Sequence, residues 1–248
     1  MNKRPVILSL ALVAAAATSA HAQAIQLRFT PQVGQVTRYR MWSRIWQAGD
    51  TTAAPSMQMS TYQTQTVTGM DGANYVVKNV TDSTVMAGGG GGGRGAGGMG
   101  DMMRGMTVTT TMDPRGHVIS TQVTPPPGLP PFVANMMTRN GAGNDNPRNR
   151  VWPEGSISPG ATWTDSMTLS TGQGRNRQQV VVTVTYKYER MDHEGGNRIA
   201  VISMNGSNGG ASLTGELHVD IDHSRMANMV TNLVQGQQVT RMNMDMVP

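Results

Sequence analysis

Methionine is the residue type whose abundance and spacing most clearly suggest chemistry, because the chain has 21 methionines and no cysteine. Met102, Met103 and Met106 lie close together directly after a glycine-rich run. Thioether sulfur is a soft ligand that suits Cu(I), so these three residues are a candidate Cu(I) site. The alternative is that methionine, with its flexible side chain, fills irregular apolar space inside the fold.

A second set of residues that could hold a metal ion shares one face of one expected strand. Glu216, His218, Asp220 and Asp222 alternate with apolar residues, so their side chains would point to the same side. Carboxylates and an imidazole on one face could present ligands to a divalent ion. The same alternation is also typical of a strand face exposed to water, and the pattern leaves both interpretations open.

The sequence motifs of common enzyme classes are not found in the chain. It has no cysteine that could act as a nucleophile, and no serine lies within a G-x-S-x-G motif. The glycine-rich run lacks the G-x-x-x-x-G-K-[ST] pattern of a phosphate-binding loop. We therefore predict a non-enzymatic protein that uses no cofactor.

Most of the chain alternates apolar and polar residues with a period of two, which predicts antiparallel strands with one buried face. Val182, Val184 and Tyr186 fall on one side of the clearest such segment. Turn residues at 113–116 and 193–197 join neighbouring segments by short links. Strands are expected at 25–29, 35–46, 57–67, 74–86, 106–112, 117–123, 180–188, 198–204, 212–221, 225–234 and 238–247.

These elements predict an all-β fold of about ten strands, arranged as one large curved antiparallel sheet or an open half-barrel. Residues 88–100 are almost pure glycine and are expected to form a flexible loop inserted between two strands. Residues 125–159 form a connecting segment rich in Pro, Asn and Gly, with one short helix at 131–139 that begins with proline. This segment would divide the sheet into halves or cover its open face. Residues 23–248 are expected to fold as a single domain.

The first 22 residues have the features of a secretory signal peptide. Lys3 and Arg4 precede an apolar run, and a small-x-small cleavage site ends at Ala22. Cleavage after Ala22 would place the remaining chain in the periplasm or outside the cell. The apolar run is too short for a transmembrane helix and no second run follows, so no transmembrane segment is expected.

One stripe of basic residues has the interleaved aromatic residues that nucleic-acid binding needs. It consists of Arg38, Arg40 and Arg44, with Trp42 and Trp46 in step. In an exported protein we expect the long arginine stems to cover one face of a strand instead. No nucleic-acid partner is therefore predicted.

Short motifs spread over much of the chain give it a resemblance to a known superfamily. They are G-x-x-x-x-Y-R at 34–40, D-x-x-G-x-V at 113–118, P-E-G-x-x-x-P-G-x-x-W at 153–163 and G-x-L-x-V-D-x-x-x-x-R at 215–225. Together with the signal peptide, this layout resembles exported bacterial β-proteins of the LolA/LppX-like lipoprotein-carrier superfamily. The resemblance implies an unclosed antiparallel barrel with helices that plug a cavity for acyl chains.

The one-sided apolar alternation, with its adaptable methionines, predicts a concave sheet face that binds an apolar small molecule, a lipid or a lipoprotein in the cell envelope. The alternatives are a methionine-rich Cu(I)-binding protein of the periplasm, and a structural or interaction module without a ligand. A packed core would use the same residues as a ligand site. The residues expected to line the site are Val182, Val184, Tyr186, Leu217, Val219, Met242 and Met244.

Overall fold

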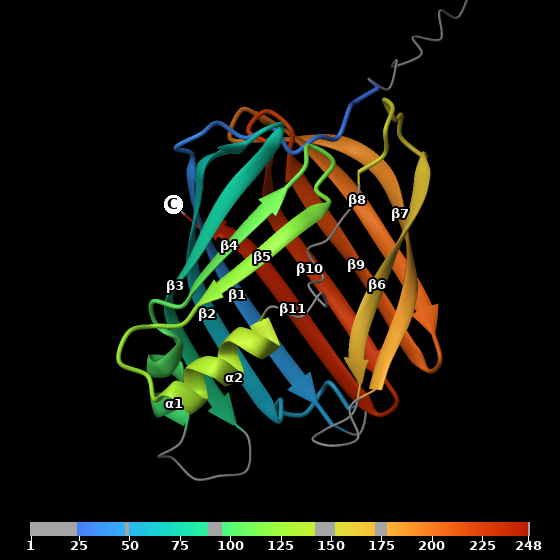
Figure 1. The fold of residues 1–248 in the computed structure, drawn as a ribbon. Helices are drawn as coiled ribbons and strands as arrows, with labels where there is room; N and C mark the ends of the chain where they lie inside the picture. The colour runs from blue at the N-terminus through green and yellow to red at the C-terminus, as the bar shows by residue number, and fades with distance from the viewer. Residues whose placement is uncertain (1–23, 48–49, 89–95, 142–151, 172–177, 248) are drawn as a thin grey trace, which may run out of the picture.

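The computed structural model describes residues 24–47, 50–88, 96–141, 152–171 and 178–247. They form one antiparallel sheet of eleven strands in the spatial order β5-β4-β3-β2-β1-β11-β10-β9-β8-β7-β6, with two short helices (Figure 1). The predicted all-β fold is confirmed. The elements are β1 (Val36–Trp46), β2 (Met57–Asp71), β3 (Asn74–Gly88), α1 (Ala96–Met103), β4 (Thr107–Met112), β5 (Val118–Thr124), α2 (Pro131–Gly141), β6 (Thr162–Thr171), β7 (Gln178–Glu194), β8 (Asn197–Asn208), β9 (Ala211–Asp220), β10 (Arg225–Gln235) and β11 (Gln238–Val247).

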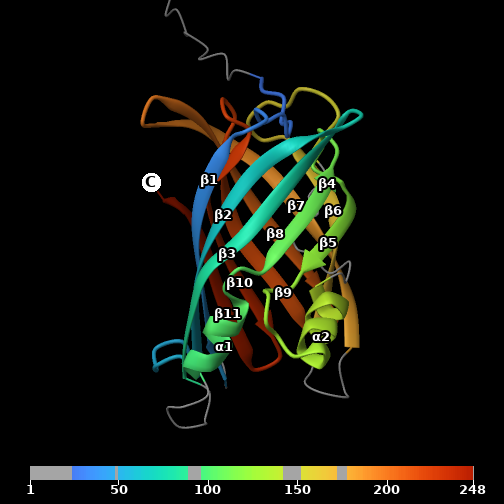
Figure 2. The same ribbon diagram turned by 60° about the vertical axis from the view of Figure 1, so that its left-hand side comes forward.

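The first and last strands, β1 and β11, pair in the middle of the sheet. Its two edges are β5 and β6, which are consecutive in the sequence. The sheet curves until these edges approach each other across an opening, and α2, which follows β5, lies at one end of that opening (Figures 1 and 2). The architecture is therefore the open half-barrel expected from the alternating strands.

The period of two seen in the sequence corresponds to buried and exposed faces of the sheet. In β7, Val182, Val184 and Tyr186 are buried, whereas Thr183 and Thr185 between them are exposed. Successive side chains of a strand point to opposite faces. The apolar positions therefore lie on the concave side, where they form the hydrophobic core with β8 and β9.

Local irregularities in the ladders help the sheet to bend. The register shifts at Tyr62, Tyr188 and Met226, and such bulges increase the local twist of a strand. Gly215 contributes in a different way, because a Cβ atom added there would lie 2.3 Å from the carbonyl oxygen of Val230. Only glycine allows β9 and β10 to approach this closely.

Two irregular segments, residues 25–29 and 152–157, run together across one end of the half-barrel, and we call them the strap. Ile25 and Ile157 join the two segments through a pair of backbone hydrogen bonds, each 2.8 Å long. Two further N–H groups of the strap donate to carbonyl oxygens of the β4–β5 turn, at 2.7 and 2.8 Å. The strap residues buried in the hydrophobic core are Ile25, Leu27, Trp152 and Ile157.

The strap corrects the prediction of a strand at 25–29. This segment makes one isolated bridge, between Ile25 and Ile157, rather than a ladder. Its alternating apolar residues are buried as expected, but the segment crosses the ends of strands instead of running beside one. Apolar alternation alone does not distinguish these two arrangements.

One helix and one strand also differ from the expected elements. Residues 96–100, expected as part of a flexible loop, belong to α1, whereas residues 89–95 lie outside the described part of the chain. Gly100 is buried, and a Cβ atom there would lie 2.1 Å from the carbonyl oxygen of Thr84, so glycine allows α1 to pack directly on β3. The helix expected at 131–139 is confirmed as α2, and β6 was not predicted.

Neither α1 nor α2 has the length and apolar character needed to cross a bilayer. The predicted signal peptide, residues 1–22, lies outside the described residues.

Candidate binding cavity

The inner face of the half-barrel changes in character from one edge to the other. On β7–β9 it carries aliphatic and aromatic side chains such as Leu217, which is fully buried in the hydrophobic core. On β2 and β3 it carries many polar side chains, and these bond to each other. The hydroxyls of Thr61 and Thr84 lie 3.2 Å apart, and Gln65 donates to Asn79 over 3.1 Å.

A row of methionines lies between the apolar and the polar part. Met229, Met244 and Met41 are direct partners across β10, β11 and β1. Directly opposite residues of a sheet point to the same face, so the three side chains form one continuous strip on the concave side. This strip places flexible, polarisable thioethers in the middle of the half-barrel.

The strip borders a cavity of about 210 Å³, which we call the methionine cavity. A cavity of about 150 Å³ with apolar walls is large enough to bind benzene, so the methionine cavity has room for a larger apolar group. The other apolar residues of its lining are Trp42, Leu213 and Leu233. The methionines that line it are Met41, Met59, Met167, Met204, Met229, Met242 and Met244.

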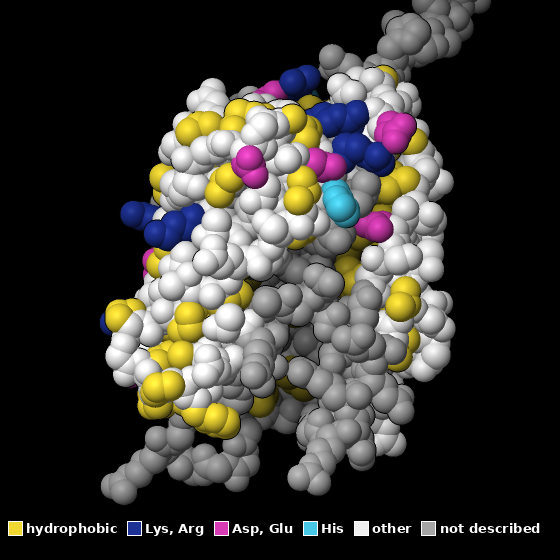
Figure 3. Space-filling model, in the orientation of Figure 1, with side chains coloured by type: hydrophobic (Ala, Val, Ile, Leu, Met, Phe, Trp, Pro, Cys, Tyr) yellow, Lys and Arg dark blue, Asp and Glu magenta, His cyan; other side chains and the backbone are white. Residues whose placement is uncertain are grey.

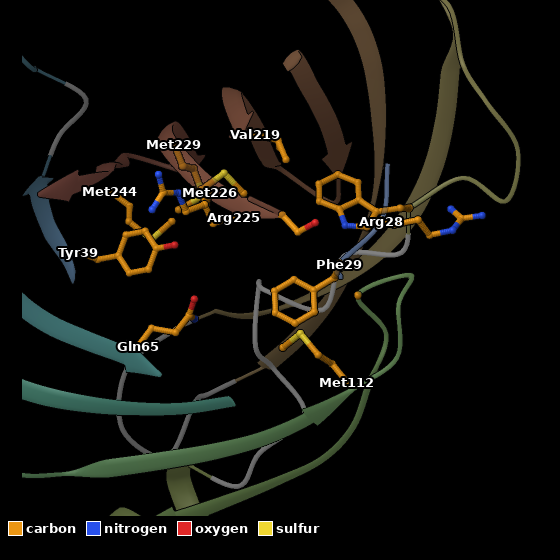
Figure 4. Close-up of a pocket in the computed structure, with 13 residues that line it drawn as sticks. Arg28, Phe29, Tyr39, Gln65, Met112, Val219, Arg225, Met226, Met229 and Met244 are labelled. Atoms are coloured by element: carbon orange, nitrogen blue, oxygen red, sulfur yellow. The ribbon is translucent and has the colours of Figure 1, made fainter. Parts of the chain in front are cut away.

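A second cavity of about 130 Å³ lies beside the strap, and we call it the strap cavity (Figure 4). Met229 and Met244 line both cavities, which are therefore neighbouring parts of one tract. Phe29 of the strap points into the second cavity (Figure 4). Arg28 and Arg225 are also part of its lining, so the tract is apolar in the middle and cationic near the strap.

One hydroxyl group in the methionine cavity is buried without a hydrogen-bond partner among the described residues. It belongs to Thr231, which is 4% exposed and lies opposite Met242 on the inner face. A buried hydroxyl without a partner costs about 1–3 kcal/mol. A polar atom of a bound molecule would remove this cost.

Tyr188 carries a second buried hydroxyl without a partner in the described part of the chain, but it lies within the hydrophobic core. Burial raises the pKa of this phenol, because the charged form is poorly solvated there. The neutral side chain thus acts as a core residue.

On the polar face of β9, one residue departs from the interpretation as a face exposed to water. Asp220 is completely buried rather than solvated. One of its oxygens, Oδ2, accepts hydrogen bonds from Nε of Arg225 at 3.0 Å and from Nδ1 of His223 at 2.9 Å. The backbone N–H groups of Asp222 and His223 donate to the other oxygen, at 3.2 and 3.1 Å. Both oxygens of the carboxylate therefore accept hydrogen bonds that stabilise the turn between β9 and β10.

The other acidic residues of this face have partners of their own. Asp222 accepts hydrogen bonds from the side chain and the backbone of Arg198, which lower the pKa of its carboxyl group. Glu216 lies 2.6 Å from Nε2 of His218. Within the described ranges, no group of three or more His, Cys, Asp or Glu residues is placed to hold a metal ion.

The residues predicted to line a ligand site are divided between the cavities and the core. Met242 and Met244 line the methionine cavity, and Val219 and Met244 line the strap cavity. The other four predicted residues belong to the packed core and line neither of these cavities. They are Val182, Val184, Tyr186 and Leu217.

Sequence reasoning missed most of the methionines of the cavity. Met41 is the only methionine of β1, and Met229 has no methionine two residues away in β10, so only their pairing with Met244 brings them into one row. Each of them lies on the inward face of its own strand, and this is the signal that could have found them. It identifies a row of methionines only when the order of the strands is known.

The methionines proposed for Cu(I) lie at the end of α1 and line neither cavity. Met102 is 45% exposed, whereas Met103 and Met106 are partly buried. The backbone N–H of Met106 donates to the carbonyl of Met103 over 3.1 Å, so the chain turns here. A Cu(I) site formed by these three residues stays a prediction.

No family model and no curated protein matches this chain. Among solved structures, the chain is similar to the hypothetical lipoprotein YmcC from Escherichia coli K12, with 9% sequence identity and a TM-score of 0.32. The match covers 86% of this chain and 87% of that one. A likeness with this TM-score is too slight to inform the fold or the function. Membership of the LolA/LppX-like superfamily therefore stays a prediction.

Proposed function

We propose that this protein is a non-enzymatic carrier of the cell envelope that binds an apolar molecule, such as an acyl chain, in the methionine cavity. The observation that carries the proposal is the row of Met229, Met244 and Met41, which faces a cavity rather than a filled core. Methionine side chains adapt to ligands of different shape. The surface that lines the cavity is mostly apolar, which favours an apolar occupant.

The lining of the cavity supports a ligand with an apolar part of modest length. The methionine cavity continues into the strap cavity through Met229 and Met244, so a ligand could extend along the half-barrel. The buried hydroxyl of Thr231 offers one hydrogen bond inside a mostly apolar wall. A lipid or the acyl chain of a lipoprotein has this combination of properties.

Blocking the cavity tests the proposal with a neutral fluorescent probe, phenylnaphthylamine. We expect Met229→Trp to weaken binding of the probe at least about tenfold, because the indole fills the tract where the two cavities meet. The matched control is Val230→Trp, since Val230 is the next residue of β10 and is 38% exposed. Equal binding by the two variants, or no binding by the wild type, would contradict the proposal.

A further inference from the structure

We infer that the ligand is an amphipathic anion, whose carboxylate or phosphate head group is bound by the guanidinium of Arg225. This inference rests on the proposed function, because it needs the apolar part of the same molecule to lie in the methionine cavity. It assigns the head group to the strap cavity and the apolar chain to the methionine cavity.

The side chain of Arg225 lies between the two cavities. Arg225 is the first residue of β10, and its side chain is 20% exposed. Figure 4 shows the side chain extending into the strap cavity, with its guanidinium near Met244 and Tyr39. The guanidinium therefore lies where the strap cavity meets the methionine row.

The bond to Asp220 fixes the orientation of this guanidinium. Arg225 donates through Nε to the completely buried carboxylate of Asp220 at 3.0 Å. The same oxygen also accepts a hydrogen bond from His223. A guanidinium has five N–H donors in a planar fork, and the bond through Nε leaves the terminal pair at the far end of the group. That pair has the geometry for a bidentate bond to a carboxylate or a phosphate.

The charges around the strap cavity favour an anion over a neutral head group. Arg28 also lines this cavity, and its guanidinium donates to the backbone carbonyl oxygens of Leu27, Pro153 and Glu154. These partners are neutral, so they orient the guanidinium without compensating its charge. Arg225 is paired with the buried carboxylate of Asp220, whereas the charge of Arg28 beside the cavity is not compensated by its own hydrogen bonds. This remaining positive charge favours an anionic ligand.

The surface carries a cluster of charged side chains at the strap end. Figure 3 shows basic, acidic and histidine side chains close together there with hydrophobic side chains beside them, and further hydrophobic side chains at the other end over α1 and α2. The methionine cavity extends from the strap cavity along β10 to Leu233. A ligand with its head group at Arg225 would therefore have its chain directed away from the strap.

Parinaric acid and its methyl ester are the probes that test this inference, because they share the same chain and differ in the head group, which is an anionic carboxylate in the acid and a neutral ester in the other. We expect the wild type to bind the acid roughly tenfold more tightly than the ester, as charge-assisted hydrogen bonds are worth that factor or more. Arg225→Gln should abolish this preference and leave the affinity for the ester within about twofold. Arg44→Gln is the matched control, since Arg44 stacks on Trp42, 4.7 Å from the ring centroid, and lines neither cavity.

A second variant guards against loss of the fold, because Arg225→Gln leaves the buried Asp220 with less compensation. Asp220→Asn combined with Arg225→Gln removes both charges, and it should show the same loss of preference for the acid. Equal affinity of the wild type for acid and ester, or a preference that survives in both variants, overturns the inference and leaves the proposed function standing. If the wild type binds neither probe, the proposed function fails as well.

Competitors then separate the sources of the anionic group. Dodecanoate and dodecyl phosphate should both displace the acid probe, whereas inorganic phosphate at the same concentration should not. Displacement by inorganic phosphate alone would overturn the inference, because the site would then recognise the anion without its apolar chain.

Discussion

Gly215→Ala is expected to destabilise the protein by about 3 kcal/mol, at the upper end of the usual range for single substitutions. The added Cβ atom would lie 2.3 Å from the carbonyl oxygen of Val230 and 3.1 Å from Cα of Thr231. Both are backbone atoms, so the collision can be relieved only by separating β9 from β10. Urea denaturation of the two proteins measures the difference in the free energy of unfolding.

Gly69→Ala is the control for this substitution. Gly69 also lies in a strand, β2, but a Cβ atom added there has no other atom within 4 Å. We expect this variant to match the wild type or to be more stable by about 0.4–1 kcal/mol, because alanine restricts the unfolded chain. Equal stability of the Gly215 and Gly69 variants would show that β9 and β10 are not as close as the structure has them.

Trp152→Ala is the second substitution with a large expected effect, a loss of about 3–5 kcal/mol in the free energy of unfolding. Trp152 is only 8% exposed, and its ring lies edge-on to Trp163 with 6.5 Å between the ring centroids. Its backbone N–H and carbonyl both bond to Arg115 in the β4–β5 turn. Losing the indole therefore removes core packing at the point where the strap joins the two edges of the sheet.

Phe132→Ala is the control for this substitution, and thermal unfolding of both variants provides the comparison. Phe132 in α2 is 78% exposed, so its truncation should change stability by less than about 0.5 kcal/mol. We expect a clearly lower unfolding temperature for the Trp152 variant alone. Similar temperatures for both variants would mean that the strap contributes little to the core.

The strands with regular alternation were predictable, because an apolar residue at every second position identifies their buried face. The sequence of β7 shows this at Val182 and Val184, which the structure places in the core. β6 lacks the signal, since Asp165 occupies the inward position between Trp163 and Met167. Only the pairing of β6 with β7 identifies it as a strand, and pairing is a long-range property.

The helix α1 shows the opposite limit of sequence reasoning. A run of glycine has low helix propensity and predicts a loop. In the structure, Gly100 allows the helix backbone to approach Thr84 of β3 more closely than any other residue would. The tertiary contact thus overrides the local preference, and nothing within the run itself reveals the partner strand.

The candidate site was predictable only in part for the same reason. Alternation in β11 identified Met242 and Met244 as inward residues, and both line the methionine cavity. It did not identify Met41 or Met229, because their row with Met244 depends on the pairing of β1 and β10 with β11. Whether inward residues enclose a void or fill a core likewise depends on the curvature of the whole sheet.

The most direct test of the central claim is NMR of the protein labelled at its methionine methyl groups, titrated with dodecanol. If the cavity binds the apolar chain, the resonances of Met41, Met229 and Met244 should shift in a saturable way. Met70 and Met102, which are 52% and 45% exposed and line neither cavity, should not shift. Shifts confined to these two exposed methionines, or no saturable shift at all, would contradict a binding site in the methionine cavity.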